Sequence, residues 1–402
     1  MDALMLPLNW QKVRLGTYKY RRGSFPQPYG NPQWYSDNGM PFVQVYDVGE
    51  NFKLTQKTKQ KISKIAQPMS VFVPKNSVII TLQGTIGRVA LTQYDCYCDR
   101  TILIFDNNTL NDVNKYFFVL SLFTKFEEEK RKADGSIIKT ITKQTLKDFE
   151  ILLPPLNEQI AIANILSALD HYLYSLDALI LKKESVKKAL SFELLSQRKR
   201  LKGFNQAWQK VRLGTYKYRR GSFPQPYGNP QWYSDNGMPF VQVYDVGENF
   251  KLTQKTKQKI SKIAQPMSVF VPKNSVIITL QGTIGRVALT QYDCYCDRTI
   301  LIFDNNTLND VNKYFFVLSL FTKFEEEKRK ADGSIIKTIT KQTLKDFEIL
   351  LPPLNEQIAI ANILSALDHE ITSLKNKKRQ FDNIKKALNH DLMSTKIRVL
   401  EK

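Results

Sequence analysis

The sequence predicts an α+β protein in which two copies of one mixed α/β domain are separated by two long, coiled-coil-like helical arms. Three observations lead to this fold class. The block from Trp10 to His171 recurs letter for letter as Trp208 to His369. Each block mixes short apolar runs, bounded by glycine and proline, with one stretch of helical composition. From Leu156 and again from Leu354, near the end of each block, more than forty residues contain neither proline nor glycine, which is typical of a long helix.

The first half of each block is expected to be rich in loops and strands. Residues 18–35 combine glycine, proline, arginine and aromatic side chains, which predicts an extended loop. Residues 41–49 alternate as a strand that ends at a turn, and lysines are concentrated in the polar segment 53–64. Further strands are expected at residues 77–82, 89–91 and 101–105, with a glycine-flanked turn at 84–88.

The second half of the block is expected to contain one helix and a closing strand. Residues 111–132 have helical composition and end in the charged run EEEKRK, after which Asp134-Gly135-Ser136 forms a loop. Ile151–Leu153 then closes the domain. These boundaries predict a domain at residues 1–153, an arm at 154–203, a second domain at 204–351 and a second arm at 352–402.

Each arm opens with a pair of prolines, which suit a first helical turn because the N–H groups of that turn have no intrahelical acceptor. In the first arm Asn157 is an alternative N-cap, and Glu158 favours the positive end of the helix dipole. Apolar side chains then recur at three- and four-residue steps, at Ile162, Leu166, Leu169, Leu173, Leu176, Ile180, Leu190 and Leu194, and in the second arm at Ile360, Leu364, Leu367, Ile371, Leu374, Phe381, Ile384, Leu388 and Leu392. A lone helix with one apolar stripe is marginal in water, so the arms are expected to pair. Packing of each arm on its own domain is the alternative, and the stripes leave the direction of the pair open.

Composition and charge narrow the class of protein. The chain has 402 residues, 42% of them hydrophobic, and can bury more than one core. Its net charge of +21 favours a polyanionic partner such as nucleic acid, and each repeated block carries 21 Lys and Arg against 15 Asp and Glu. Two Cys-x-Cys pairs lack neighbouring ligands, which predicts reduced thiols rather than zinc. Without a signal pattern or a bilayer-length apolar run, the protein is expected to be soluble and cytoplasmic, with no membrane partner.

No catalytic residue and no metal ligand is expected on this chain. Residues 31–34, Asn-Pro-Gln-Trp, superficially resemble the Asn-Pro-Pro-aromatic motif of amino-methyltransferases, but the third residue differs and no glycine-rich cofactor loop precedes them. The turn at 84–88 lacks the Gly-Lys-Ser/Thr ending of a phosphate loop. Glu128 and Lys130 lie in a charged run typical of a solvated helix face. The histidines lie on the arms without partners at metal-ligand spacing.

Nucleic-acid binding fits the sequence better. Base edges are read by Arg, Lys, Asn and Gln, and cationic side chains contact the phosphates. The candidate contacts are Lys19, Arg21, Arg22, Gln27, Tyr29, Gln33, Lys57, Lys59, Gln83, Arg88, Lys139 and Lys143, with the copies Lys217, Arg219, Arg220, Gln225, Tyr227, Gln231, Lys255, Lys257, Gln281, Arg286, Lys337 and Lys341. Two alternatives stay open: the aromatic residues of the 18–35 loop anchor it on its own core, or the lysines form a plain solvated surface.

The order of these features resembles the specificity subunit of type I DNA restriction–modification systems. The resemblance rests on RRGSFPQP at 21–28, then GMPFVQVYDVG, VIITLQGTIGRVAL and ADGS, and most specifically on Leu-Pro-Pro-Leu-x-Glu-Gln before a helix. It covers nearly the whole chain. That family has two target-recognition domains alternating with two helical conserved regions, which is the arrangement expected here.

The resemblance implies several properties that the residues alone do not. Arms at about 157–200 and 355–398 are implied to pack antiparallel in a pseudo-two-fold arrangement, with the domains at opposite ends. The subunit is implied to be non-catalytic, to bind double-stranded DNA and to recruit two methyltransferase subunits and restriction subunits. S-adenosylmethionine, ATP and Mg²⁺ are then expected on those partners, with no cofactor on this chain.

Identical domains depart from the family pattern, in which the two domains usually differ. If a two-fold axis relates the domains, the target is an inverted repeat made of a half-site, an unread spacer and the reverse complement of that half-site. A parallel arm pair predicts a direct repeat instead. A stand-alone DNA-binding regulator, and a self-sufficient methyltransferase or nuclease, are the alternative functions.

Overall fold

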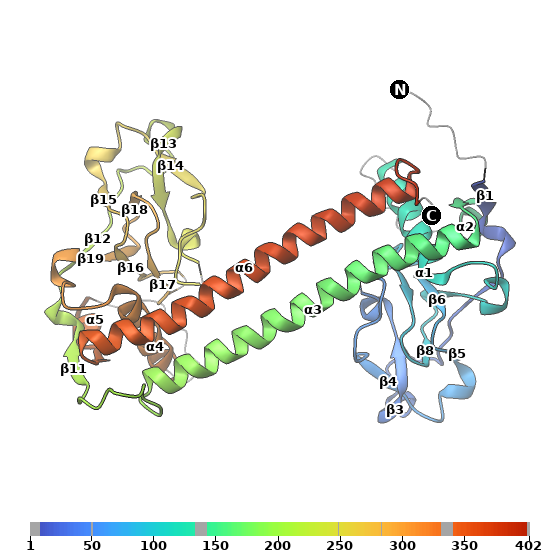
Figure 1. Cartoon of the computed structure of the whole chain (residues 1–402), viewed down its shortest axis with the longest axis horizontal. Coiled ribbons are helices and arrows are strands. Elements are labelled where there is room, and N and C mark those ends of the chain that lie inside the picture. The colour runs from blue at the N-terminus through green and yellow to red at the C-terminus, as the bar shows by residue number, and fades with distance from the viewer. Residues whose placement is uncertain are drawn as a thin grey trace. The chain divides into compact units, whose positions relative to one another are not determined.

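The computed structural model describes residues 9–49, 51–132, 143–247, 249–282, 284–330 and 341–399. Two compact units form within it. The first comprises Met1–Asp177 with Asn376–Lys402, and the second comprises Ala178–Lys375. Each unit therefore contains one copy of the repeated domain and one segment of each arm, and Figure 1 labels the elements.

Ten short strands and two helices form the first domain within its described residues. The strands are β1 (Gln11–Arg14), β2 (Tyr20–Arg22), β3 (Tyr35–Val43), β4 (Gln60–Ile62), β5 (Val71–Val73), β6 (Val78–Thr81), β7 (Val89–Leu91), β8 (Cys96–Cys98), β9 (Ile102–Phe105) and β10 (Glu150–Leu153), and the helices are α1 (Lys115–Lys132) and α2 (Lys143–Asp148). Three sheets result, ordered β1-β10, β2-β9-β6-β7 and β4-β3-β8-β5. All pairs are antiparallel except β3 with β8, which is parallel.

The core of the domain lies in layers. One cluster packs α1 and the start of the arm against the β2-β9-β6-β7 sheet and includes Phe105, Phe117 and Phe118. A second cluster, which includes Ile79 and both cysteines, lies between the two four-stranded sheets. A small aromatic cluster around Phe25 and Phe42 covers part of the β4-β3-β8-β5 sheet. Continuous apolar strands such as β6 and β9 are buried over their whole length because both faces of their sheet are covered.

The second domain repeats this architecture. Its strands are β11 (Gln209–Arg212), β12 (Tyr218–Arg220), β13 (Tyr233–Val241), β14 (Gln258–Ile260), β15 (Val269–Val271), β16 (Val276–Thr279), β17 (Val287–Leu289), β18 (Cys294–Cys296), β19 (Ile300–Phe303) and β20 (Glu348–Leu351), with α4 (Lys313–Lys330) and α5 (Lys341–Asp346). The sheets have the same strand order and register. The predicted mixed α+β domain, present twice, is confirmed.

The arms are two helices of 40 residues each, α3 (Leu156–Leu195) and α6 (Leu354–Met393). Within each unit a segment of α3 lies beside a segment of α6, and as the α3 number rises the number of its α6 partner falls. In the first unit Asp170 pairs with Lys385 and Asp177 with Lys378. In the second unit Lys183 and Lys187 pair with Glu370 and Asp368. The helix segments in each unit are therefore antiparallel.

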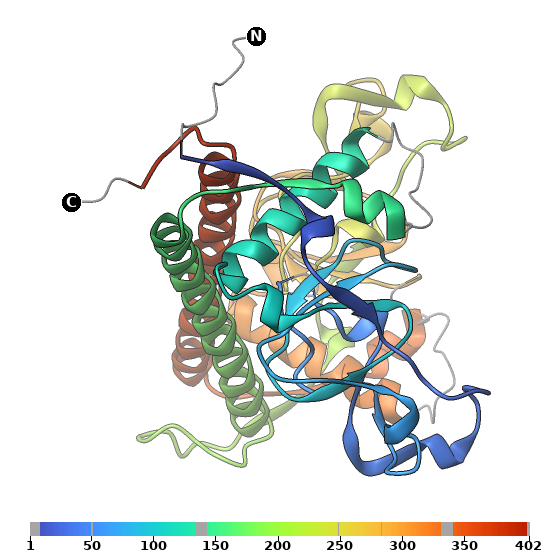
Figure 2. The same ribbon diagram turned by 90° about the vertical axis from the view of Figure 1, so that its right-hand side faces the viewer.

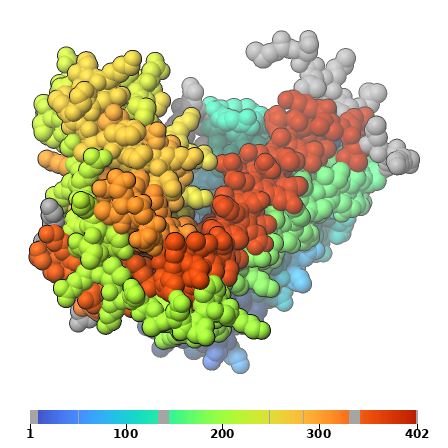
Figure 3. All heavy atoms as spheres, turned by 60° about the vertical axis from the view of Figure 1, so that its left-hand side comes forward, coloured from blue at the N-terminus to red at the C-terminus, as the bar shows by residue number. Residues whose placement is uncertain are grey.

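Both arms are also part of the domain cores, so the two alternatives that the sequence left open are combined in one structure. In the first unit Ile162 and Leu166 of α3 and Leu392 of α6 belong to the main core cluster, and Figure 2 shows this unit toward the viewer, with α3 and α6 on one flank. In the second unit Leu194 of α3 and Leu364 of α6 do the same. Figure 3 shows the start of α6, in red, against the orange segment that contains α4.

Two local predictions for the arms were wrong. Helix α3 begins at Leu156, so Asn157 lies inside the first turn, where its side-chain oxygen accepts the Glu158 N–H at 3.0 Å. Ile384 was placed on the apolar stripe of α6 but is 50% exposed. Lys385 faces inward instead, because the ion pair with the Asp170 carboxylate compensates its ammonium group for the loss of hydration.

Several strand predictions also need correction. The strand expected at 41–49 is β3, which begins at Tyr35 and ends at Val43, and a 3-10 turn occupies Val45–Asp47. The expected loop at 18–35 contains β2. Strands β1, β4, β5 and β8 were not predicted, because each is short and forms only by pairing with other strands. The short helix α2 was not predicted either. The loop expected at 134–136 lies outside the described residues.

Candidate nucleic-acid interface

A buried aspartate organises the loop that follows β3. Asp47 is 2% exposed, and its carboxylate accepts the backbone N–H groups of Gln44 at 2.9 Å and Lys59 at 3.0 Å. Its backbone carbonyl accepts the Thr55 N–H at 2.9 Å. Burial raises the pKa of the Asp47 carboxyl above its ordinary value, although these hydrogen bonds act in the opposite direction. The loop formed by residues 44–49 and 51–59 is therefore fixed at both ends by one side chain.

The glycine-flanked turn lies directly against this loop. Gly84 has a φ of +73°, which favours glycine, and a Cβ atom at this position would approach the Val45 side chain to 3.5 Å. Arg88 Nη1 donates to the Val48 carbonyl at 3.1 Å, which ties the far end of the turn to the same loop. Gln83, which precedes Gly84, is exposed.

Four polar residues of this loop and of the adjoining turn form what we call the polar edge: Gln44, Tyr46 and Lys59 on the loop, and Gln83 beside Gly84. Tyr46 is 47% exposed, and its hydroxyl group donates to the Gln44 side-chain oxygen. The Lys59 ammonium group lies 5.1 Å from the centre of the Tyr46 ring. In the second domain the polar edge consists of Gln242, Tyr244, Lys257 and Gln281, with the same lysine–tyrosine distance of 5.1 Å.

The chemistry of the polar edge suits a duplex. A glutamine amide offers a donor and an acceptor, which matches the N6 and N7 edge of adenine in the major groove. A lysine on an aromatic ring retains free N–H groups for a phosphate oxygen. Asp47 and Arg88 hydrogen-bond to the loop backbone and hold it in one conformation. The side chains of the polar edge can therefore bind a partner without a large loss of conformational entropy.

Strand β2 separates the two arginines that the sequence placed together. Successive side chains of a strand point to opposite faces, so Arg22 shares a face with Tyr20 and Arg21 has the other face. Arg21 Nη2 donates to the Phe72 carbonyl at 3.0 Å, so its guanidinium group is engaged within the domain. The Arg22 side chain is exposed, and within the described residues no hydrogen bond or ion pair of its guanidinium group is found.

The aromatic side chains of the 18–35 segment pack on the domain. Tyr29 and Trp34 belong to the aromatic cluster around Phe25, and the Tyr29 hydroxyl donates to the Asp99 carboxylate. Burial raises the pKa of the Tyr29 phenol well above its ordinary value, so the phenol remains a donor. Arg100 lies 5.3 Å from the centre of the same ring. This packing favours the anchoring alternative for Tyr29, and Tyr227 makes the same bond to Asp297 at 2.7 Å.

The remaining candidates are dispersed. Lys19, Gln27, Gln33 and Lys57 are exposed, and only Lys57 lies on the loop of the polar edge. Lys139 and Lys337 lie outside the described residues, and Lys143 and Lys341 begin α2 and α5 with side chains that are not described. The copies in the second domain occupy equivalent positions, with Lys217, Arg220, Gln225, Gln231 and Lys255 exposed, Arg219 bonded to the Phe270 carbonyl and Arg286 bonded to the Val246 carbonyl. The structure thus brings together Lys57, Lys59, Gln83 and Arg88 from the predicted set.

Sequence reasoning missed Gln44 and Tyr46. Both were assigned to a strand at 41–49, in which alternate side chains would have been buried. The available signal was an aspartate three residues after Gln44, a spacing at which a side chain can accept the N–H at the start of a turn.

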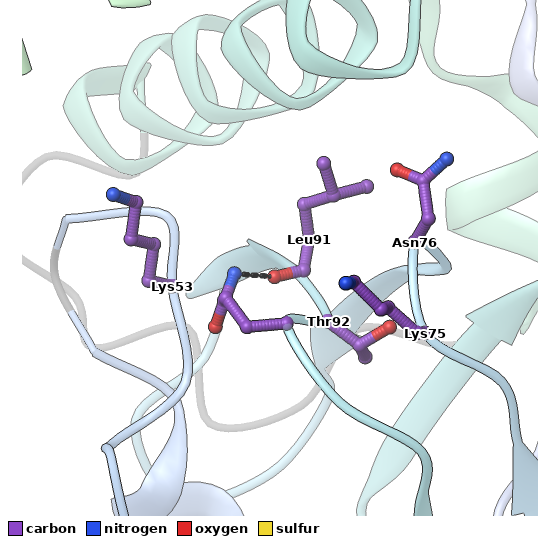
Figure 4. A pocket seen from close by; sticks show the side chains of 6 residues that line it. Lys53, Lys75, Asn76, Leu91 and Thr92 are labelled. Atoms are coloured by element: carbon purple, nitrogen blue, oxygen red, sulfur yellow. Dashed lines mark hydrogen bonds between the residues drawn. The ribbon is translucent and has the colours of Figure 1, made fainter. Parts of the chain in front are cut away.

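An open hollow of about 620 Å³ lies beside the middle of the same loop, at Lys53. Figure 4 shows Lys53 on one side of it and Lys75 and Asn76 on the other, with Leu91 and Thr92 between them. The Lys53 ammonium group also lies 5.9 Å from the Tyr174 ring of α3. Two cationic groups at one hollow suit an anionic group such as a phosphate. Neither lysine is among the candidate contacts selected from the sequence.

Comparison with known proteins decides the family. The family described as type I restriction modification DNA specificity domain matches residues 23–183 and again residues 225–381. This chain belongs to that family. The resemblance predicted from the sequence is confirmed, and the two matched ranges cover most of each domain and part of each arm.

Individual members of the family are similar over most of the chain. A putative type I restriction enzyme MjaX specificity subunit from Methanocaldococcus jannaschii is 28% identical over 298 residues, which covers 70% of this chain and 68% of that one. The type I restriction enzyme MjaVIII specificity subunit from the same organism is 23% identical over 99% of this chain and 95% of its own length. The crystal structure of a type I restriction-modification S subunit from M. genitalium shares the fold, with a TM-score of 0.62, 18% identity and coverage of 96% and 98%.

Three further observations concern the described residues of this specificity subunit. In the described ranges, no helix has the length and apolar character needed to cross a bilayer. The same residues contain no group of three or more His, Cys, Asp or Glu side chains arranged to hold a metal ion. All four cysteines are buried and free.

Proposed function

We propose that this specificity subunit recognises a split, inverted-repeat DNA site and recruits to it partner subunits that carry out DNA methylation and cleavage. The identity of the two domains supports this proposal, because identical residues held in identical local contacts are expected to read identical half-sites. Each unit also holds its domain on an antiparallel pair of equivalent helix segments. A two-fold rotation exchanges the two helices of such a pair, so it favours half-sites of opposite direction.

The same proposal includes three further points. The two polar edges contact bases and phosphates, the subunit has a non-catalytic role, and the chain divides into domains and arms at residues 153, 203 and 351. We assign DNA contact to the polar edges together with Arg22 and Arg220. Adenine methylation and DNA cleavage are assigned to two methyltransferase subunits and to restriction subunits, with S-adenosylmethionine, ATP and Mg²⁺ bound there. The arms suit recruitment because Ile160, Leu181 and Val186 are 42%, 64% and 46% exposed. Co-purification with a methyltransferase is expected, and a stand-alone regulator would lack this partner.

Selection of bound duplexes from a random pool tests the site. We expect enrichment of a gapped palindrome, because two identical domains on antiparallel arms contact opposite strands with the same residues. Sequencing of the bound fraction over successive rounds measures the enrichment. A direct repeat, or one isolated half-site without a second copy, would contradict the proposed arrangement.

The polar edge can be separated into phosphate and base contacts by two paired variants. Lys59→Ala with Lys257→Ala should weaken binding to all duplexes about equally, and each lost phosphate contact should lower the slope of log K against log salt by roughly 0.9. Gln44→Ala with Gln242→Ala should instead reduce discrimination at one base pair per half-site by about 1–3 kcal/mol. Fluorescence anisotropy at several salt concentrations distinguishes these outcomes. An unchanged base preference in the glutamine variant would remove Gln44 from the set of base contacts.

A further inference from the structure

A carboxylate on each arm joins a domain to both helices. In the first unit the Asp170 carboxylate on α3 accepts the Tyr116 hydroxyl from α1 and pairs with the Lys385 ammonium group of α6. The Asp170 and Lys385 side chains are only 13% and 16% exposed. Burial raises the pKa of the Tyr116 phenol well above its ordinary value, so the phenol stays protonated and keeps donating. We call Tyr116, Asp170 and Lys385 the first junction.

The second unit contains the same junction with the helices exchanged. Asp368 on α6 accepts the Tyr314 hydroxyl from α4 and pairs with Lys187 of α3. The side chains of Lys187 and Asp368 are 17% and 19% exposed. Each domain is thus connected to the helix that follows it and to the helix that follows the other domain.

The junction lysines also contact the loop that carries the polar edge. The Lys385 ammonium group lies 5.3 Å from the centre of the Phe52 ring, and the Lys187 ammonium group lies 5.4 Å from that of Phe250. Phe52 has a φ of +62°, a conformation that a bulky residue holds only when its surroundings fix it. Its ring packs edge-on against Phe123 of α1 at 5.1 Å. Because Phe52 lies midway between Gln44 and Lys59, the helix lysine touches the loop whose ends present the polar edge.

The two arms differ at most positions but share the junction lysines. Of the 29 positions from 172 to 200, nine have the same residue at the counterpart positions 370 to 398, and Lys187 with Lys385 is one of those pairs. The other ion pairs found between α3 and α6 in the described residues have no such counterpart. The ion pair of Lys183 with Glu370 in the second unit is replaced in the first by a ring contact of Phe381 with Tyr172. General helix packing tolerates this exchange, whereas the junction is the same in both units.

We propose that Lys187 and Lys385 are positioning residues that fix each polar edge on the arms and thereby set the spacer length that the subunit accepts between half-sites. The proposal rests on the proposed DNA recognition. A polar edge that can rotate on its arm would contact half-sites separated by a range of spacer lengths. A polar edge that is fixed on its arm would contact half-sites at one spacer length only. The lysines touch no DNA in this scheme and act through Phe52, Phe250 and the two aspartates.

Lysine-to-methionine substitution tests this role because methionine keeps an aliphatic side chain and removes the ammonium group. Lys187→Met with Lys385→Met is compared with the intact subunit in selection from a pool of gapped duplexes. We expect the selected spacers to spread to one or two base pairs on either side of the original length, with an unchanged half-site sequence. Affinity for the original spacing should fall several-fold, and affinity for a duplex with a single half-site should not change.

A matched control removes two other lysines that pair across the helices. Lys375 bonds to Glu184 at 2.6 Å and Lys378 to Asp177 at 2.7 Å, and neither pair includes a domain residue. Lys375→Met with Lys378→Met should keep the original spacer distribution. Equal broadening in this control would show that helix pairing as a whole, rather than the junction, sets the spacing and would overturn the proposal.

A second variant keeps the test decisive if the lysine variant fails to fold. Tyr116→Phe with Tyr314→Phe leaves both ion pairs in place and removes only the hydroxyl bonds from α1 and α4. Partial broadening of the spacer distribution is expected from this variant, and a distribution identical to that of the intact subunit would count against the junction. Failure of the intact subunit to bind any duplex would instead reject the proposed function, so the two failures are distinguishable.

Discussion

Replacing Arg200 with alanine is expected to destabilise the second unit by about 3 kcal/mol, because a buried carboxylate loses its counter-charge. The Glu356 side chain is 1% exposed and receives Arg200 Nη2 at 2.7 Å and Nε at 3.2 Å. Trp208 Nε1 donates to the same carboxylate at 3.2 Å. One indole N–H does not compensate a buried negative charge once the guanidinium group is gone. Denaturant unfolding of the purified chain measures the loss.

The first unit provides the matched control. Arg398 is the counterpart of Arg200, but its Nη2 lies 3.8 Å from Glu158 and its side chain is 47% exposed. Arg398→Ala should therefore cost about 1 kcal/mol or less. Hydrogen exchange shows which unit each variant destabilises. Peptides from 172–207 and 370–402 must be followed, because peptides from the two copies of the repeated block have identical sequences and cannot be told apart. Equal losses in the two variants would contradict the assignment, and Glu356→Gln should restore part of the stability lost in Arg200→Ala.

Replacing Arg22 and Arg220 together is expected to cause the largest loss of DNA binding. If each guanidinium group contacts a base edge, discrimination should fall by about 1–3 kcal/mol per half-site, or roughly 5- to 150-fold. The structure favours Arg22 over its neighbour because its side chain is exposed and lies on the opposite face of β2 from Arg21. Competition binding with duplexes altered at single positions measures the change. Loss of affinity with unchanged base preference and a smaller salt slope would reassign Arg22 to a phosphate.

Arg21→Ala with Arg219→Ala is the control for this experiment. These guanidinium groups donate to the Phe72 and Phe270 carbonyls at 3.0 and 2.9 Å, so their loss should lower stability and leave base preference intact. A change in base preference from this pair would show that the face of β2 opposite to Arg22 meets the DNA.

The two parts of the molecule were predictable to different degrees. The duplicated block, the buried strands β6 and β9 and the two 40-residue helices follow from local pattern, because apolar periodicity and the absence of proline and glycine act within one segment. Strands β5 and β8 have three residues each and become strands only as ladder partners, β5 of β8 and β8 of both β5 and β3. Gln44 and Tyr46 were missed for a related reason, since the hydrogen bonds of Asp47 to Gln44 and to Lys59, twelve positions later, convert an expected strand into a turn.

By itself the sequence determined that one domain occurs twice, that each copy is followed by a long helix and that the chain resembles a type I specificity subunit. These are properties of residue order, and they need no knowledge of which segments meet. The tertiary structure decided that the helix segments in each unit run antiparallel, that Arg21 and Arg22 have opposite faces, and that Lys187 and Lys385 connect the arms to the loops of the polar edge. Such contacts join residues up to 333 positions apart, as in the pair of Phe52 and Lys385. Which side chains at such separations are buried, and which charges pair, depends on how the elements pack and not on local sequence pattern.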